Sequence, residues 1–289
     1  MRFDAERCLA AALEACRHAG AIHRDHFRAS GLAVERKADA SPVTRADRGS
    51  EEAIRETLRR AIPELGVLGE EFGQEGDERD RWVVDPLDGT RNFVAGLPYF
   101  ATLIGLELDG ELVLGVVHAA ALGPGSGLEA SPLVSDWTAD PAGLGETWCA
   151  VRGQGAFGGT GTDPGTVRRR KLRVSEVNDL SRAFLVHGGL VHFQKVGLWP
   201  AFGELVSRVE RTRGFGDWWG HVLVAEGRCD AMVEPTVAYH DVAAIRVLIE
   251  EAGGVFLTRG NVPLGTGFRE GAISSNAALA GELREVLGF

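Results

Sequence analysis

An apolar segment of the chain ends in two carboxylates three residues apart, Asp85 and Asp88. Two carboxylates held this close repel each other unless a cation lies between them, and oxygen ligands alone suit a hard cation such as Mg²⁺ or Mn²⁺. Pro86 is expected to end the strand, and Gly89 permits a tight turn after it. Beyond this turn the backbone N–H groups of Gly89 and Thr90 would face an anion. The segment therefore predicts a site for a metal ion and a phosphate group.

Two further carboxylates stand at the ends of other expected elements. Glu70 follows a short apolar strand, and Asp241 stands at the start of an amphipathic helix, where the helix dipole favours a negative charge. The alternative for Asp241 is a helix cap without any role in chemistry. Alone, each residue says little about function.

Hydrophobic periodicity predicts an alternation of helices, hairpins and single strands around these residues. Helical spacing extends over 4–27, through 54–62, and over about 199–209, 218–226, 241–252 and beyond 276. Strand-like runs occupy 66–69, 82–84, 100–108, 112–117, 148–151, 171–174, 184–187, 231–234, 255–258 and 272–274. Residues 37–47 are expected to form a loop, and 123–147 a long excursion. The pattern predicts layered α/β or α+β architecture with a boundary near residues 150–180.

The composition is that of a globular protein and disfavours several functions. The chain has 289 residues, of which 44% are apolar and 25% charged, and a formal net charge of −10. Such a field repels nucleic acid, and no apolar run approaches the ~20 residues of a membrane helix. The 4 cysteines form no C-x-x-C pair, which favours reduced thiols and a cytoplasmic location. We expect no nucleic-acid partner, no signal peptide and no membrane anchor.

Three motifs, taken in order, resemble the inositol monophosphatase superfamily of Mg²⁺-dependent, lithium-sensitive phosphatases. They are Gly69-Glu70-Glu71, Asp85-Pro86-Leu87-Asp88-Gly89-Thr90 and His240-Asp241-Val242-Ala243-Ala244. The likeness extends to 41–47, 152–157 and 224–230, and so covers nearly the whole chain. It implies an α/β (α+β) fold, the layered αβαβα sandwich, as one domain over 1–289 with subdomains of about 1–180 and 181–289. It also implies a homodimer and a site shared between the subdomains.

The resemblance also implies roles for individual residues. About two or three Mg²⁺ ions, with Mn²⁺ as an alternative, would be held by the carbonyl oxygen of Leu87 and the carboxylates of Glu70, Asp85, Asp88 and Asp241. The phosphate donors of the family fall on Gly89 and Thr90. Asp47 and Thr90, beside Glu70, would orient and deprotonate the attacking water. For Asp47 the alternative is a helix-capping carboxylate.

The expected reaction is direct hydrolysis of a phosphate monoester. Metal ions can lower the pKa of a water molecule, hold it in line and neutralise the leaving oxygen, which together supply most of the required rate enhancement. The sequence contains neither a G-x-S-x-G elbow nor an H-E-x-x-H motif, so no covalent phospho-enzyme is expected.

Two features favour L-histidinol phosphate as the substrate. Residues 214–221, with Asp217 followed by two tryptophans, are more similar to the histidinol-phosphatase branch than to the inositol-type enzymes. Asp217 and Glu234 would attract a substrate with an ammonium or imidazolium group, and Asn92 would add a polar contact. The alternative for Asp217 is a surface or helix-capping acid. His240 departs from the family, since many relatives carry an aromatic residue there.

Two alternatives stay open. The first is an inositol-1-phosphate or broad sugar-phosphate phosphatase, which uses the same metal chemistry. The second is a phosphatase-fold protein that acts mainly by binding a macromolecular partner, and its only support is the basic run at 168–173. We interpret this run as a charged strand edge, which prevents unwanted strand pairing.

Overall fold

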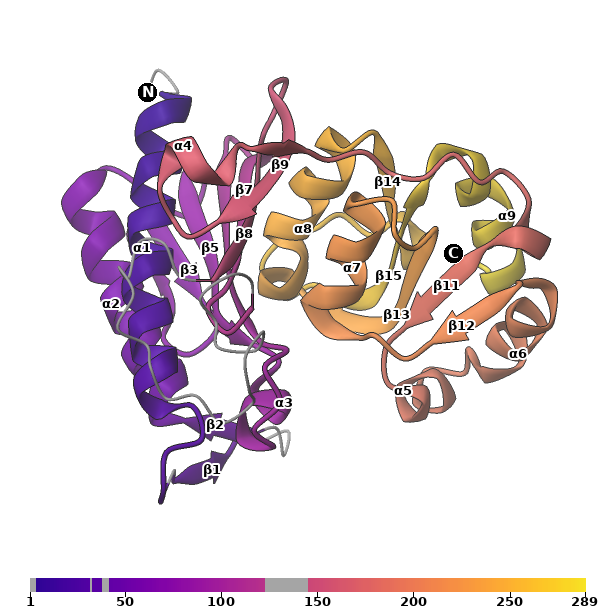
Figure 1. Cartoon of the computed structure of the whole chain (residues 1–289), viewed down its shortest axis with the longest axis horizontal. Helices are drawn as coiled ribbons and strands as arrows, with labels where there is room; N and C mark the ends of the chain where they lie inside the picture. The colour runs from indigo at the N-terminus through magenta and orange to yellow at the C-terminus, as the bar shows by residue number, and fades with distance from the viewer. Residues whose placement is uncertain (1–3, 32, 38–41, 123–144) are drawn as a thin grey trace.

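Two β-sheets alternate with layers of helices in this protein (Figure 1). The structure is a computed structural model that describes residues 4–31, 33–37, 42–122 and 145–289. The layered α/β architecture expected from the sequence is confirmed. Most of the excursion expected over 123–147 lies outside the described residues, as does Ser41.

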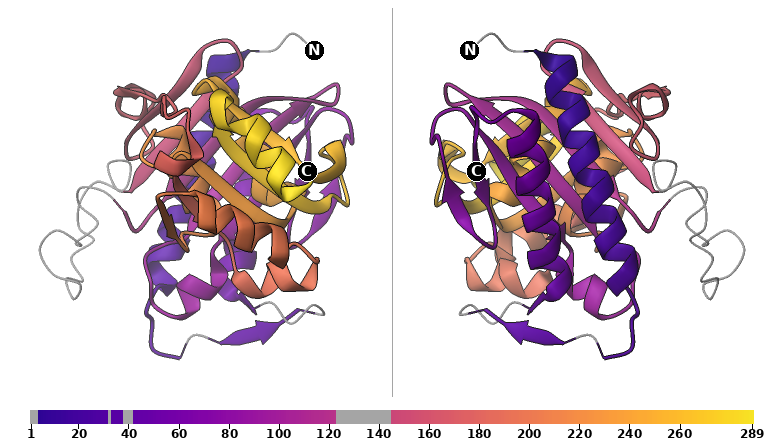
Figure 2. Two further views of the ribbon diagram at one scale, coloured as in Figure 1. Left: turned by 90° about the vertical axis from the view of Figure 1, so that its right-hand side faces the viewer. Right: turned by 90° about the vertical axis from the view of Figure 1, so that its left-hand side faces the viewer.

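The helices fall into three layers. In Figure 1, α1 and α2 cover the outer face of the larger sheet, α7 and α8 lie between the sheets, and α6 and α9 cover the far face of the smaller sheet. Figure 2 shows α1 and α2 side by side in one view and α9, in yellow, in the opposite view. The helices are α1 (Ala5–His26), α2 (Arg45–Ala61), α3 (Thr90–Val94), α4 (Pro164–Val167), α5 (Leu190–Lys195), α6 (Trp199–Arg208), α7 (Asp217–Ala225), α8 (Tyr239–Glu251) and α9 (Ala277–Leu287).

The larger sheet has 8 strands in the order β10-β9-β8-β7-β6-β5-β3-β4, and the smaller has 5 in the order β12-β11-β13-β15-β14. The larger sheet contains β3 (Gly66–Gly69), β4 (Gly73–Glu75), β5 (Arg81–Asp88), β6 (Ala101–Leu108), β7 (Glu111–Ala119), β8 (Glu146–Val151), β9 (Gly155–Thr160) and β10 (Arg170–Lys171). The smaller sheet contains β11 (Phe184–His187), β12 (Arg211–Arg213), β13 (Ala231–Ala238), β14 (Gly254–Thr258) and β15 (Arg269–Asn276). A separate pair joins β1 (Val34–Arg36) to β2 (Pro42–Thr44).

The larger sheet is buried on both faces, and β5 shows how its sequence achieves this. Trp82 and Val84 pack into the core beneath α1 and α2, whereas Val83 packs into the core around α7 and α8. Successive side chains of a strand point to opposite faces, so a strand buried on both faces is apolar throughout instead of alternating.

Glycines let α8 lie close against the larger sheet. A Cβ built on Gly115 of β7 would lie 2.2 Å from the carbonyl oxygen of Ala244, and one on Gly105 of β6 would lie 3.0 Å from the Cβ of Ala243. The small residues on both sides thus fix the distance between α8 and the sheet that carries Asp85. This distance bears on the predicted metal site because Asp241 lies in the first turn of the same helix.

Most elements expected from the sequence are present. Asp109 and Gly110 form the turn of a hairpin between the strands expected over 100–108 and 112–117, and both residues have the positive φ, 55° and 81°, that such turns require. All 4 cysteines lie in the described residues, and they are free and buried. Within the described ranges, no helix combines the length and apolarity needed to cross a bilayer.

Three expectations were wrong in detail. The polar segment 37–47 is not a loop throughout, since Pro42–Thr44 form β2 and α2 begins at Arg45. The strand expected over 171–174 is only Arg170–Lys171, because the chain leaves β9 after Leu172 and the N–H of Val174 donates to the carbonyl oxygen of Ala252. Pro86 does not end its strand, because β5 continues to Asp88. The elements β1, β4, β9, α3, α4, α5 and β12 were not expected, because their residues carry no clear period.

Gly115→Ala tests the close packing of α8. The added methyl group meets backbone, which cannot move aside as a side chain can, so we expect the free energy of unfolding to fall by about 2–3 kcal/mol. The control is Gly281→Ala in α9, where an added Cβ meets nothing within 4 Å and stability should rise by up to ~1 kcal/mol. Chemical denaturation measures both, and equal stability of the two variants would contradict the packing argument.

Candidate active site

The two carboxylates of the central motif stand at the carboxyl end of β5. The register between β5 and β6 shifts between Asp85 and Asp88, so Pro86 lies in a bulge, where its missing N–H interrupts no ladder bond. The strand therefore continues to Asp88 instead of ending at the proline. Asp85 is 2% exposed, and its Oδ1 accepts the N–H of Leu87 at 3.0 Å. The bulge thus holds a carboxylate away from bulk water.

Gly89 makes the turn that follows. Its φ is +87°, and a Cβ there would lie 2.7 Å from the carbonyl oxygen of Tyr99, so the turn requires glycine. Gly89 is also the N-cap of α3, which begins at Thr90. The first N–H groups of a helix have no partner within it. The two N–H groups expected to face a phosphate therefore follow directly after Asp88.

Glu70 reaches the same edge because β3 and β5 are parallel neighbours, in which Gly69 pairs with Val84. The N–H of Glu70 donates to the carbonyl oxygen of Val84 at 3.1 Å. The carboxyl ends of parallel strands lie at one edge of a sheet, where open α/β sheets place their sites. The buried carboxylate of Glu51 holds the next residue by accepting the N–H of Glu71 at 2.7 Å.

Asp241 uses its two carboxylate oxygens differently. Oδ2 accepts the N–H of Ala238 at 2.7 Å and so caps α8, as the alternative interpretation expected. Oδ1 lies 3.2 Å from Nε2 of His240, and that nitrogen lies 4.0 Å from Oε1 of Glu70. The cap therefore fixes the carboxylate and leaves its second oxygen near the other acids.

Asp47 repeats this arrangement at the start of α2. Its Oδ2 accepts the N–H and the hydroxyl of Thr44, each at 2.7 Å, so the capping alternative is again correct in part. Its Oδ1 accepts the hydroxyl of Thr90 at 2.9 Å. The same hydroxyl lies 3.0 Å from the carbonyl oxygen of Leu87. Burial, above all, raises the pKa of Asp47, which makes it a better proton acceptor.

The electrostatics of the cluster favour a cation. Burial and then the charges of Glu70, Asp88 and Asp241 raise the pKa of Asp85 well above its usual value. Burial and then the charges of Asp217 and Asp241 do the same for the pKa of Asp88. When the charges of neighbouring carboxylates raise the pKa of a carboxyl group, a bound cation stabilises its ionised form.

The donor set fits a divalent metal ion. Glu70, Asp85 and His240 each offer a ligand atom, and these atoms all lie within 4.8 Å of one another. Two donors on opposite sides of one ion stand about 4.2 Å apart at metal–oxygen bonds of ~2.1 Å. A small movement of these three side chains toward one another would therefore let all three bind one ion. The residues are therefore compatible with the metal dependence expected of the fold.

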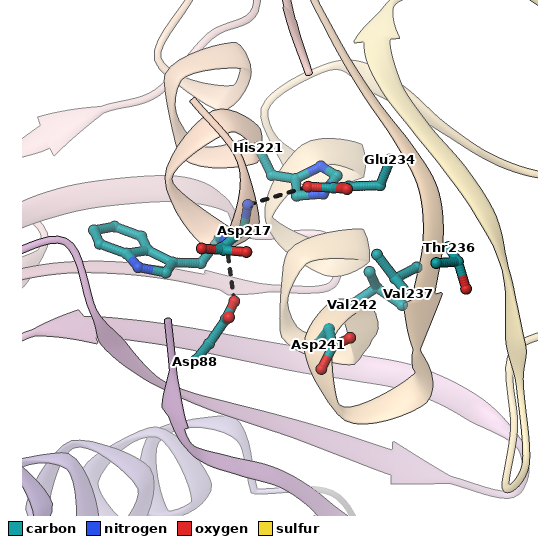
Figure 3. Close-up of a pocket in the computed structure, with 9 residues that line it drawn as sticks. Asp88, Asp217, His221, Glu234, Thr236, Val237, Asp241 and Val242 are labelled. Carbon is teal, nitrogen blue, oxygen red and sulfur yellow. Dashed lines mark hydrogen bonds between the residues drawn. The ribbon is translucent and has the colours of Figure 1, made fainter. Parts of the chain in front are cut away.

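A pocket beside the cluster brings in the residues expected to recognise the substrate (Figure 3). Asp88, Asp217, Glu234 and Asp241 all line it. The N–H of Asp217 donates to Oε1 of Glu234 at 3.1 Å, and Nδ2 of Asn92 donates to Oδ2 of Asp217 at 3.2 Å. Burial and then the charge of Asp217 raise the pKa of Glu234 well above its usual value. One wall of the pocket is thus acidic.

All the residues singled out in the sequence lie in or beside this region, and their roles stay predictions. Two neighbours were missed. Lys37 places Nζ 2.7 Å from Oε1 of Glu70 and also contacts Glu71, but its position 33 residues away carries no motif. His240 was noted only as a departure from the family, although its position beside Asp241 was the available signal.

The basic run lies at the edge of the larger sheet, where two of its arginines pair with acids. Arg168 pairs with Glu6, Arg170 pairs with Glu146 and Glu226, and β10 is the edge strand of the larger sheet. The predicted position at a strand edge is confirmed, and the macromolecular partner stays a prediction.

Comparison with known proteins agrees with this geometry. A model of the inositol monophosphatase family matches residues 4–287. The histidinol-phosphatase of Streptomyces coelicolor is 38% identical over 277 residues, covering 94% of this chain and 92% of that protein. That of Mycobacterium tuberculosis is 39% identical over 244 residues, covering 84% of each. The solved structure of an inositol monophosphatase from Zymomonas mobilis superposes with a TM-score of 0.77 and 30% identity, covering 100% of both chains.

The raised pKa of Asp85 predicts a pH dependence of stability in the metal-free protein. The pKa of Asp85 is higher in the folded protein than its value of about 4 in the unfolded chain. Asp85 therefore lowers the free energy of unfolding as the pH rises from the unfolded-state pKa toward the folded-state pKa, whereas below the unfolded-state pKa this loss is absent. Asp85→Asn removes this loss. Without metal, the variant should therefore gain on the wild type by up to about 1.4 kcal/mol per pH unit over this window.

Thermal unfolding at pH values from about 4 to about 7, in EDTA and in Mg²⁺, measures this difference in stability. We expect Mg²⁺ to reverse the order, because only the wild type keeps the full carboxylate set. A variant that is less stable than the wild type in EDTA at neutral pH would contradict the repulsion argument.

Proposed function

The chain belongs to the inositol monophosphatase family, and from this premise we propose that it is a Mg²⁺-dependent hydrolase of L-histidinol phosphate. Its relatives are phosphoric monoester hydrolases of a metal-dependent family, and the chain is such a hydrolase. Two relatives that align along most of the chain carry the name histidinol-phosphatase, which supports the choice of substrate.

The acidic pocket wall is the observation that carries this choice. Asp217 and Glu234 are joined by a backbone hydrogen bond of 3.1 Å and lie in one pocket with Asp88. Two neighbouring acids favour a cationic group, because an ammonium or imidazolium offsets their mutual repulsion. Histidinol phosphate carries such groups, whereas a polyol phosphate does not.

The metal ions are proposed to be held by the carboxylates of Glu70, Asp85, Asp88 and Asp241 and the carbonyl oxygen of Leu87. When bound, they supply Lewis-acid activation of water and neutralise charge on the phosphate and the leaving oxygen. The chain's contribution is to bring oxygen donors from β3, β5 and α8 to one edge of the sheet.

Asp47 and Thr90 are proposed to orient the attacking water. A hydroxyl group donates one hydrogen and accepts others, so Thr90, when it donates to Asp47 at 2.9 Å, turns its lone pairs outward to accept a hydrogen from water. The raised pKa of Asp47 favours transfer of that proton. Glu70, which is also a proposed metal ligand, is proposed to take part in activating the same water. The N–H groups of Gly89 and Thr90 hold the phosphate oxygens.

A second candidate, an inositol-1-phosphate or broad sugar-phosphate phosphatase, shares the same metal site. The structural likeness to the inositol monophosphatase of Zymomonas mobilis is the observation that favours it. The two candidates differ in the group that faces Asp217 and Glu234.

We further propose that the protein acts in the cytoplasm as a homodimer with no nucleic-acid partner. The free cysteines and the net charge of −10 support the location and the absence of nucleic acid, and the dimer follows from the family resemblance. Light scattering on the purified protein tests the dimer.

A phosphate-release assay decides between the substrates. The panel contains L-histidinol phosphate, myo-inositol 1-phosphate, fructose 1,6-bisphosphate and adenosine 3′,5′-bisphosphate, each with Mg²⁺. We expect the highest kcat/KM for histidinol phosphate. Equal or better hydrolysis of the polyol phosphates would replace the first proposal with the second.

Asp217→Asn tests the acidic wall without changing the backbone. Asp217 has a φ of +56°, which asparagine also tolerates. Loss of one charge-assisted hydrogen bond of ~1.5–3 kcal/mol should lower kcat/KM for histidinol phosphate by about 10- to 100-fold. Hydrolysis of an uncharged alkyl phosphate should change by less than about threefold.

The matched control for this variant is Asp109→Asn. Asp109 also has a positive φ, 55°, but lies in the β6–β7 hairpin at the end of β6 opposite the site. Asp109→Asn should leave the hydrolysis of histidinol phosphate and of the uncharged alkyl phosphate unchanged. An equal loss for all substrates in Asp217→Asn would indicate that Asp217 supports the structure of the site instead of recognising a cation.

A further inference from the structure

We propose that His240 is a direct ligand of the metal ion held by Glu70 and Asp85, and that this nitrogen donor shifts the site toward first-row transition ions such as Mn²⁺ over Mg²⁺. The inference rests on the metal site of the proposed function. It goes beyond it, because the ligand set implied by the resemblance contains oxygen atoms only.

The geometry places the imidazole with the carboxylates. The ligand atoms of Glu70, Asp85 and His240 all lie within 4.8 Å of one another. Nε2 is the imidazole atom that faces the acids, at 4.0 Å from Oε1 of Glu70 and 3.2 Å from Oδ1 of Asp241. Cis ligands of a six-coordinate ion stand about 3 Å apart and trans ligands about 4.2 Å apart at bonds of ~2.1 Å. After a small closure, the spacing therefore suits three ligands of one ion.

The backbone holds His240 in this place. It lies between Tyr239 and Asp241 in the first turn of α8, and the bond from the N–H of Ala238 to Asp241 at 2.7 Å fixes that turn. Tyr239 is buried, whereas the side chain of His240 is 19% exposed. The imidazole is thus presented at the rim of the site by a rigid element.

The chemistry of the donor sets the expected selectivity. Carboxylate, carbonyl and water oxygens suit Mg²⁺, whereas imidazole is a ligand for transition ions, whose affinity for nitrogen-containing sites rises along the first row. Loss of one nitrogen ligand should cost a transition ion more than it costs Mg²⁺. The other arrangement of the same residues is an outer one, in which His240 only donates a hydrogen bond to a bound carboxylate.

Electron spin-echo envelope modulation of the full chain loaded with Mn²⁺ distinguishes these arrangements, because a directly bonded imidazole gives a ¹⁴N coupling. We expect the coupling in the wild type, its loss in His240→Asn and His240→Phe, and its retention in His192→Asn. His192 lies on α5 and is exposed, so it is the matched control. Circular dichroism of each variant checks that the fold is intact.

Metal titrations give the second measurement. In His240→Asn we expect the Mn²⁺ affinity to fall by about tenfold or more and the Mg²⁺ affinity to change by less than about threefold. Bound Mn²⁺ without a ¹⁴N coupling in the wild type would overturn the inference and leave the proposed function standing. If neither ion binds, the metal site of the proposed function fails as well.

Discussion

Mutual repulsion among buried and half-buried carboxylates is the constraint on which the rest of the site depends. Asp85 and Asp88 lie at the end of β5, Glu70 joins them from the parallel β3, and Asp241 approaches from α8. In addition to burial, the charges of Glu70, Asp88 and Asp241 raise the pKa of Asp85, and that of Glu70 also raises the pKa values of Asp88 and Asp241. A protein keeps such a cluster only if a bound cation or a proton taken up by one of the acids offsets the repulsion. The packing of α8 against Gly105 and Gly115 brings Asp241 to this cluster.

Helix capping solves the problem of holding these charges still. Asp47 and Asp241 each stand in the first turn of a helix, and each gives one oxygen to a backbone N–H three residues earlier. The other oxygen is left for the site. A carboxylate fixed in this way loses little conformational freedom when it binds a ligand, which is how a rigid element preorganises a reactive group.

The sequence predicts the parts of the site that are local and misses those that are not. Asp85, Asp88 and Gly89 form one turn, so their chemistry can be read from spacing alone. Glu70 and Asp241 could be assigned only through the family resemblance, because their approach depends on parallel pairing and helix packing. Lys37 contacts Glu70 from a segment without a period, and the bulge at Pro86 depends on the partner strand β6. Capping and chemistry appeared as alternatives in the sequence, but the two oxygens of a carboxylate allow both.

The start of α7 joins the residues proposed for substrate recognition to the proposed metal site. The N–H of Trp218 donates to Oδ2 of Asp88 at 2.9 Å, and the N–H of Asp217 donates to Oε1 of Glu234 at 3.1 Å (Figure 3). Adjacent N–H groups can point to both acids because Asp217 adopts a positive φ of 56°, a conformation that costs energy in most residues and is kept where surrounding contacts enforce it. One strained residue therefore ties the carboxylate of β5 to the acid of β13. A substrate that draws Asp217 and Glu234 together by its positive charge would also hold Asp88 in place, so the proposed recognition of substrate and the positioning of the proposed metal ligand would share a single backbone turn.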